Sequence, residues 1–219
     1  MKLFVDKKDC CGCAACANIC PKSAITMEKD EIGQYYPRIN EALCVDCGTC
    51  MRVCDFQKKD ENQFGHQVLS AYGAASKNES LIKKSASGGM FAQLAEFFLE
   101  TGGVVYGAAM LGDDKLWVKH IRVEDKAQLY LIQGSKYIQS DIGDTYQKVK
   151  QDLVRKAGPV FWHSVSGSGV EKFFEEGLRK SYCCRYCLSW SFHSADFSGL
   201  HKFSRKKEKY KNYKFCISG

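Results

Sequence analysis

Eight cysteines in two short runs carry the most specific chemistry in this sequence. The run from Cys10 to Cys20 and the run from Cys44 to Cys54 share the spacing C-x2-C-x2-C-x3-C. Three thiols two residues apart can surround one 4Fe–4S cube from a single loop, and the next turn carries the fourth thiol to a second cube. We therefore predict two 4Fe–4S clusters with crossed ligands. The first cluster is assigned Cys10, Cys13, Cys16 and Cys54, and the second Cys20, Cys44, Cys47 and Cys50.

Other uses of clustered thiols fit this pattern less well. Disulfide frameworks are typical of small secreted chains, but the residues before Cys10 are charged and do not form an apolar signal segment. Zinc sites use pairs of Cys, or Cys with His, at other spacings. Cys11 breaks the spacing if it is taken as the first ligand, so we interpret it as a spare thiol. Thirteen Cys without a signal segment indicate a reducing compartment, and we expect a cytoplasmic location.

The residues around the two runs predict a small domain over 1–58. The runs begin 34 residues apart, which indicates an internal duplication of the kind found in bacterial ferredoxins. Short helical turns are expected at Ala14–Ile19 and Thr49–Val53, and two short strands at Ala24–Met27 and Gln34–Ile39. Gly33 lies in the turn between the strands, where positive φ is easily adopted.

A second unit is predicted over residues 68–160, after a polar linker at 59–67. Strand patterns alternate with helical ones, which is typical of an α/β domain. The expected strands are 68–75, 104–110, 117–123, a turn into a strand at 134–140, and a strand from Val160. The expected helices are 90–99, 125–132 and 144–157, the first with an apolar stripe at helical spacing.

Charge and hydropathy exclude some classes of partner. The net charge is +7, but seven basic residues and one acidic residue lie in 201–219, so the excess belongs to the tail and not to a folded basic face. We therefore expect no nucleic-acid partner. No run reaches the ~20 apolar residues that a membrane-spanning helix needs, so no membrane span is expected.

Three motifs follow the Cys runs in order: Ser87-Gly88-Gly89, then Gly103 to Gly107, then Gly134 to Tyr137. Together with the runs, this order resembles the coenzyme F-420 hydrogenase/dehydrogenase beta subunit family over residues 1 to about 160. The resemblance implies an oxidoreductase subunit that passes electrons between 4Fe–4S clusters and FAD, and in some lineages onward to a deazaflavin coenzyme. Its partner would be a redox protein or a small-molecule electron carrier.

The same resemblance implies a set of residues that line a flavin pocket. These candidates are Ser87, Gly88, Gly89, Gly134, Ser135, Lys136 and Tyr137. In that role Lys136 would pair with a phosphate, and the amides near Gly88 would cradle one. Alternatives stay open: Ser87 to Gly89 equally fits an ordinary helix N-terminus, Lys136 a solvated surface charge, and Tyr137 a core position.

The likeness ends abruptly after Val160. The family has Gly-Thr-Pro-Cys-Gln there, whereas this sequence reads Trp162-His163-Ser164 and contains no Cys at that point. Back-translated with permitted codons and read one nucleotide later, Phe161–Phe173 becomes Ser-Gly-Ile-Pro-Cys-Gln and onward, which resembles the missing motif. Residues 182–191, back-translated and read in the same shifted frame, also give a sequence that resembles the family. We therefore predict that 161–219 is an aberrant, frameshifted and poorly ordered tail, and that the chain does not retain flavin.

These observations predict an α+β chain: a small duplicated ferredoxin-type domain followed by a truncated α/β domain. The expected function is iron–sulfur electron transfer in a flavin-linked oxidoreductase subunit, and whether the chain is itself an enzyme stays open. The alternatives are a ferredoxin-type carrier that works alone, or a disrupted family member without activity.

Overall fold

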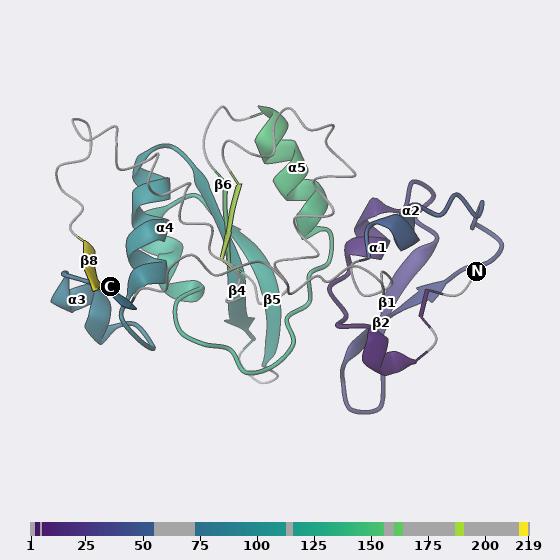
Figure 1. Cartoon of the computed structure of the whole chain (residues 1–219), viewed down its shortest axis with the longest axis horizontal. Helices are drawn as coiled ribbons and strands as arrows, with labels where there is room; N and C mark the ends of the chain where they lie inside the picture. Colours follow the sequence, from purple (N-terminus) through teal and green to yellow (C-terminus); the bar gives the residue numbers. More distant parts are fainter. Residues whose placement is uncertain are drawn as a thin grey trace.

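The computed structural model of the chain describes residues 3–4, 6–54, 73–112, 116–155, 160–163, 187–190 and 215–218. Helices and strands occur throughout, so the chain is an α+β protein as predicted. An N-terminal unit of residues 3–54 adjoins a second unit built around a sheet (Figure 1). Within the described ranges, no helix has the length and apolar character needed to cross a bilayer.

The N-terminal unit is a strand pair with helical turns on one side. Its elements are η1 (Lys7–Asp9), α1 (Ala15–Ile19), β1 (Ile25–Lys29), β2 (Tyr35–Ile39) and α2 (Thr49–Arg52). β1 and β2 pair antiparallel, with Ile25 opposite Ile39. The turn between them is tight because the Asp30 carboxylate accepts hydrogen bonds from the backbone N–H groups of Ile32 and Gln34. The predicted strands and helical turns of this unit are thus confirmed within one to two residues.

The second unit is organised on a mixed sheet with the strand order β5-β4-β6-β7. Its elements are β3 (Gly73–Ser76), α3 (Glu79–Lys83), α4 (Met90–Glu100), β4 (Val104–Leu111), β5 (Trp117–Val123), η3 (Lys126–Leu131), α5 (Thr145–Arg155), β6 (Val160–His163), β7 (Cys187–Trp190) and β8 (Phe215–Ser218). β4 and β5 are neighbours in sequence and pair antiparallel, whereas β6 follows the helix α5 and pairs parallel with β4. β3 pairs with β8 outside this sheet.

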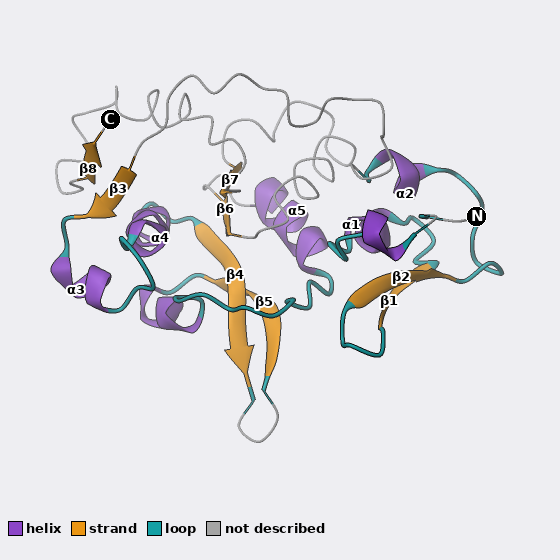
Figure 2. Ribbon diagram, turned by 60° about the horizontal axis from the view of Figure 1, so that its bottom comes forward, coloured by secondary structure: helices purple, strands orange, loops and turns teal. Residues whose placement is uncertain are grey.

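The central strand β4 has buried residues on both faces. Val105 and Ala109 face α4 and η3, in a cluster that includes Phe97 and Phe98. Val104 and Tyr106 face α5 on the other side. Figures 1 and 2 show α4 and α5 on opposite sides of β4 and β5. This alternation follows from the two-residue period of a strand, and it makes β4 the strand on which both layers pack.

Some expectations about the chain after the N-terminal unit need correction, and others lie partly or wholly outside the described residues. Gly134–Ser140 is a loop and not a strand: Gly134 takes a left-handed φ of 77°, and the one β-bridge to β5 near this segment joins Lys119 and Asp141. The helix α3 was not predicted. The expected strand 68–75 is described only from Gly73, as β3, and the linker 59–67 lies outside the described residues.

The predicted aberrant tail, 161–219, lies mostly outside the described residues. Within it, the structure describes the end of β6, together with β7 and β8, as short strands that pair with the second unit. The prediction that this segment is encoded out of frame concerns the coding DNA, and it stays a prediction.

Candidate iron–sulfur site

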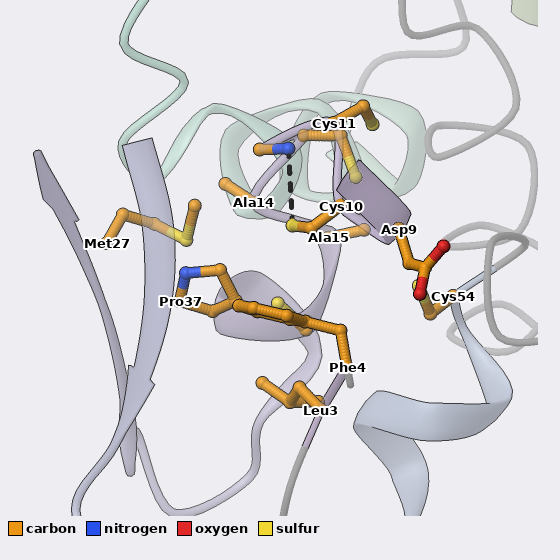
Figure 3. Close-up of a pocket in the computed structure, with 13 residues that line it drawn as sticks. Leu3, Phe4, Asp9, Cys10, Cys11, Ala14, Ala15, Met27, Pro37 and Cys54 are labelled. Carbon is orange, nitrogen blue, oxygen red and sulfur yellow. Dashed lines mark hydrogen bonds between the residues drawn. The ribbon is translucent and has the colours of Figure 1, made fainter. Parts of the chain in front are cut away.

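Four thiols of the first predicted set line one cavity in the N-terminal unit. Cys10, Cys13, Cys16 and Cys54 all contribute to its wall, and so does Cys11. Apolar side chains form most of the rest of the wall, among them Phe4, Met27 and Pro37, and Asp9 also lies at it, as Figure 3 shows. The cavity thus combines sulfur donors with a mostly apolar lining.

Short helical elements position these thiols. Cys10 directly follows η1, Cys13 and Cys16 lie on either side of the start of α1, and Cys54 follows α2. Ala14 between them has a left-handed φ of 59°, which turns the chain sharply into α1. Cys54, near the C-terminal end of the unit, lines the same cavity as Cys10, near its N-terminal end (Figure 3).

A second cavity is lined by the four thiols of the second predicted set. Cys20, Cys44, Cys47 and Cys50 contribute to it, together with residues from the loops that carry them. The backbone N–H of Ala24 donates to the Cys20 Sγ over 3.3 Å. The Cys47 Sγ lies 3.4 Å from the hydroxyl oxygen of Thr49. Each cavity thus brings together three thiols of one run and the last thiol of the other.

In both cavities the thiols lie around a space and do not converge on one point. In the described part of the chain, no three His, Cys, Asp or Glu side chains are placed to hold a single metal ion. A 4Fe–4S cube presents a separate iron to each thiolate, so its four ligands stand around the cube and do not meet at one point. The second cavity matches that requirement with its four thiols. The first matches it with the four predicted ligands, while Cys11 and Asp9 also line its wall.

Burial raises the pKa of thiols in both cavities, including Cys50 in the second. Burial raises the pKa of Cys16 to about 12 and also raises the pKa of Cys10. A hydrogen bond with Cys11, followed by burial, raises the pKa of Cys13. In the second cavity, the hydroxyl of Thr49 lowers the pKa of the exposed Cys47. The first cavity therefore disfavours free thiolates, and iron would supply the compensating positive charge.

Gly12 is required by close packing beside the first cavity. Its φ is +66°, and a Cβ there would lie 2.4 Å from the Tyr35 carbonyl oxygen and 2.2 Å from the Gln139 Nε2. Its backbone N–H donates to the Cys10 Sγ over 3.4 Å, the bond drawn dashed in Figure 3. Gly48, in the second run, has φ +71° and no atom nearer than 3.6 Å, so only its turn conformation needs glycine.

The Ser87–Gly89 motif connects the second unit's edge to α4. The Gly88 carbonyl accepts a hydrogen bond from the Ser76 N–H over 2.7 Å, and a Cβ on Gly88 would lie 2.9 Å from the Ala74 carbonyl oxygen. Gly89 is buried, with a left-handed φ of 72° at the start of α4, whereas Ser87 is exposed. Both glycines thus have a local packing or turn reason to be there.

The Gly134–Tyr137 motif forms the loop after η3. The Lys136 ammonium donates to the carbonyl oxygens of Gln133 over 2.6 Å and of Gly134 over 3.1 Å, with a longer contact of 3.4 Å to Leu131. Tyr137 is 93% exposed, which excludes the core position that the sequence left open. Ser135 is also exposed. Among the described residues, no hydrogen bond joins this motif to Ser87–Gly89, and neither Cys-lined cavity includes either motif.

Comparison with known families matches both units. The family described as "4Fe-4S dicluster domain" matches residues 9–58. The family described as "Coenzyme F420 hydrogenase/dehydrogenase, beta subunit N-term" matches residues 71–145. The two matches fall on the two units of the fold.

Two curated relatives align with part of the chain. An uncharacterized ferredoxin of Methanocaldococcus jannaschii is 34% identical over 73 residues, which is 29% of this chain and 94% of that protein. A protein named "Ferredoxin 7Fe", from Hydrogenibacillus schlegelii, is 31% identical over 83 residues, which is 37% of this chain and 97% of that protein. Both relatives are thus covered almost entirely.

Proposed function

Because the chain belongs to the coenzyme F420 hydrogenase/dehydrogenase beta subunit family and carries a ferredoxin-type 4Fe–4S domain, we propose that it relays single electrons through two 4Fe–4S clusters. The ferredoxin-type domain gives the chain an electron-transfer role. In this proposal Cys10, Cys13, Cys16 and Cys54 hold the first cluster, and Cys20, Cys44, Cys47 and Cys50 hold the second. The single observation that carries it is the pair of cavities, each lined by four thiols of the crossed sets.

The chain's own residues would do three things for the clusters. Thiolates bind the irons, and each thiol gives up its proton when iron binds. Backbone N–H groups such as those of Gly12 and Ala24 donate to ligand sulfurs and so stabilise negative charge there. The apolar wall around the first cavity, including Phe4 and Met27, excludes water. A bound 4Fe–4S cluster supplies a one-electron redox couple.

The number of irons distinguishes two complete 4Fe–4S clusters from the iron content that one relative's name gives. One relative's name specifies seven iron atoms. All eight ligand positions are Cys in this chain. We therefore propose two complete cubes.

A flavin-linked reaction is the second candidate function, and the family membership favours it. The described residues do not fit a flavin well. Lys136, the candidate for a phosphate, already donates to backbone carbonyls, and Tyr137 points its side chain into solvent. Gly88 packs directly against the backbone of β3, which leaves no room there for a side chain. We therefore derive no step through flavin, and we propose that the chain works as a carrier for a redox partner, either a protein or a small molecule.

Electron counting separates these possibilities. The full chain, reconstituted anaerobically and fully reduced, is titrated with a coloured one-electron acceptor. Two cubes predict about two electrons per chain, one from each cube. About four electrons, together with flavin absorbance, would favour the flavin-linked function. No reducible centre at all would identify a disrupted family member.

A further inference from the structure

The first cavity lies where the two units meet. Ala14, Ala15 and Val53 of the N-terminal unit pack in one buried cluster with Tyr146 and Val149 of α5, and Cys13 and Cys16 pack against that cluster. Both cavities are lined only by residues of the N-terminal unit. In contrast to Cys13 and Cys16, the thiols Cys20 and Cys50 of the second cavity pack in a cluster that contains N-terminal residues alone. Contacts across the interface can therefore act on the first site without touching the second.

One side chain of the second unit reaches the loop that carries the first thiols. The Gln139 Nε2 lies 3.3 Å from the Cys11 carbonyl oxygen and 3.5 Å from the Gly12 carbonyl oxygen. The Gln139 Oε1 accepts the Tyr35 N–H over 2.7 Å. Because a backbone N–H can only donate, this bond fixes which end of the amide faces Tyr35, and it leaves the NH2 group directed at Cys11.

The peptide group that Gln139 contacts is the one that bonds the first ligand. The Cys11 carbonyl and the Gly12 N–H belong to the same peptide unit, and that N–H donates to the Cys10 Sγ over 3.4 Å. A hydrogen bond to the carbonyl orients this peptide plane and polarises it, so the N–H becomes a better donor. Hydrogen bonds to cluster sulfurs are one determinant of the reduction potential.

We propose that Gln139 is a positioning residue for the first cluster: it orients the Cys11–Gly12 peptide so that its N–H stabilises the Cys10 sulfur. The inference rests on the proposed function, since it requires a cluster on Cys10. Reduction adds negative charge to the cluster, and a stronger N–H···S bond favours the reduced form. Gln139 therefore raises the potential of the first cluster and has no effect on the second.

The test uses the full chain, reconstituted anaerobically, in a redox titration followed by EPR. The hyperfine-shifted Cβ protons of Cys10, observed by NMR, identify the first cluster. Gln139→Ala removes the donor and shifts the first midpoint potential to more negative values. Gln139→Glu keeps an acceptor for the Tyr35 N–H but cannot donate when ionised, and it adds negative charge, so its shift is larger. The second midpoint stays at its wild-type value in both variants.

A matched control separates an effect on the Cys11–Gly12 peptide from a general effect of contacts between the two units. The Gln147 Nε2 also donates across the interface, to the Asn18 carbonyl oxygen over 3.3 Å, but Asn18 is the fourth residue of α1 and carries no ligand sulfur. Gln147→Ala therefore leaves the first midpoint unchanged. Equal shifts for Gln147→Ala and Gln139→Ala, or an unchanged first midpoint in Gln139→Glu, would overturn the inference. Absence of clusters in the wild-type chain would instead overturn the proposed function.

Discussion

At the scale of single residues, each cavity is lined by the last Cys of the other run. Cys54 lines the first cavity although it belongs to the second run, and Cys20 lines the second cavity although it belongs to the first. The spacing C-x2-C-x2-C-x3-C predicts crossed ligands, because three residues of helical turn carry the fourth thiol away from its neighbours. The cavities support the predicted sets, and ligand replacement tests them.

Cys54→Ala should damage the first cluster and spare the second. Removal of one thiolate leaves the first cube with three ligands, whereas Cys44, Cys47 and Cys50 still share the second cube with Cys20. The matched control is Cys20→Ala, for which the reverse loss is expected. EPR of the two reduced variants shows which cluster each variant has lost. Loss of the second cluster in Cys54→Ala would show that each run closes on itself.

The comparison of Gly12 with Gly48 tests how closely the first Cys loop packs against β2. Both have positive φ, so alanine costs about 1 kcal/mol at either position from backbone strain alone. At Gly12 the new Cβ would also meet the Tyr35 carbonyl at 2.4 Å, which should add roughly 1–3 kcal/mol. Chemical denaturation of the two variants measures the difference. Equal destabilisation would contradict the close approach of Gly12 to β2.

At the scale of elements, periodic and turn signals predicted most of what the structure describes. The apolar stripe of α4 and the alternation in β5 were visible in sequence because packing follows the period of each element. The prediction of a strand at 134–140 was wrong. Its apolar residues Tyr137 and Ile138 are exposed, so the segment has no buried face that would hold it in a sheet. The helix α3 has only five residues, too few for a periodic signal.

A polar network adds to the apolar contact between β4 and α5. The Tyr106 hydroxyl donates to the Asp152 carboxylate over 2.6 Å, and burial raises the pKa of Tyr106, so the hydroxyl keeps its proton. Arg122 also bonds this carboxylate. The three side chains join β4, β5 and α5 in one network.

Tyr106→Phe should lower the free energy of unfolding by about 1.5–3 kcal/mol, the usual contribution of a hydrogen bond to a charged group. The ring stays in place, and Asp152 keeps Arg122 as a partner. Tyr130→Phe, at a position that is 69% exposed, serves as the control and should change stability by less than about 0.5 kcal/mol. A result for Tyr106→Phe as small as that for Tyr130→Phe would contradict the network's role.

At the scale of the whole molecule, the contact between the two units could not be predicted from sequence. Gln139 lies 104 residues from Tyr35 and 128 from Cys11, and no local pattern marks a polar side chain that reaches so far. The flavin candidates were implied by a family motif, but their local hydrogen bonds depend on the fold around them. Lys136 is an example, since carbonyls of its own loop are its partners.

The reading frame after Val160 remains a prediction about the DNA. If 161–219 is encoded out of frame, sequencing of the coding DNA will show that the bases one position later spell Ser-Gly-Ile-Pro-Cys-Gln and continue the family pattern through residues 182–191. The physical reason to expect this is the loss of the family motif at one point and the Lys- and Tyr-rich composition of 202–214, which has no apolar period. Nucleotides that do not give this text would refute the frameshift.

Iron and sulfide content tests the central claim most directly. The full chain is reconstituted anaerobically, freed of unbound metal by gel filtration, and analysed for iron, acid-labile sulfide and zinc. Two cubes predict about eight iron and eight sulfide per chain. The variant that lacks both Cys20 and Cys54 should not reach this content, because each cube then lacks one ligand. A wild-type value near four iron, or zinc in place of iron, would contradict the two-cluster account.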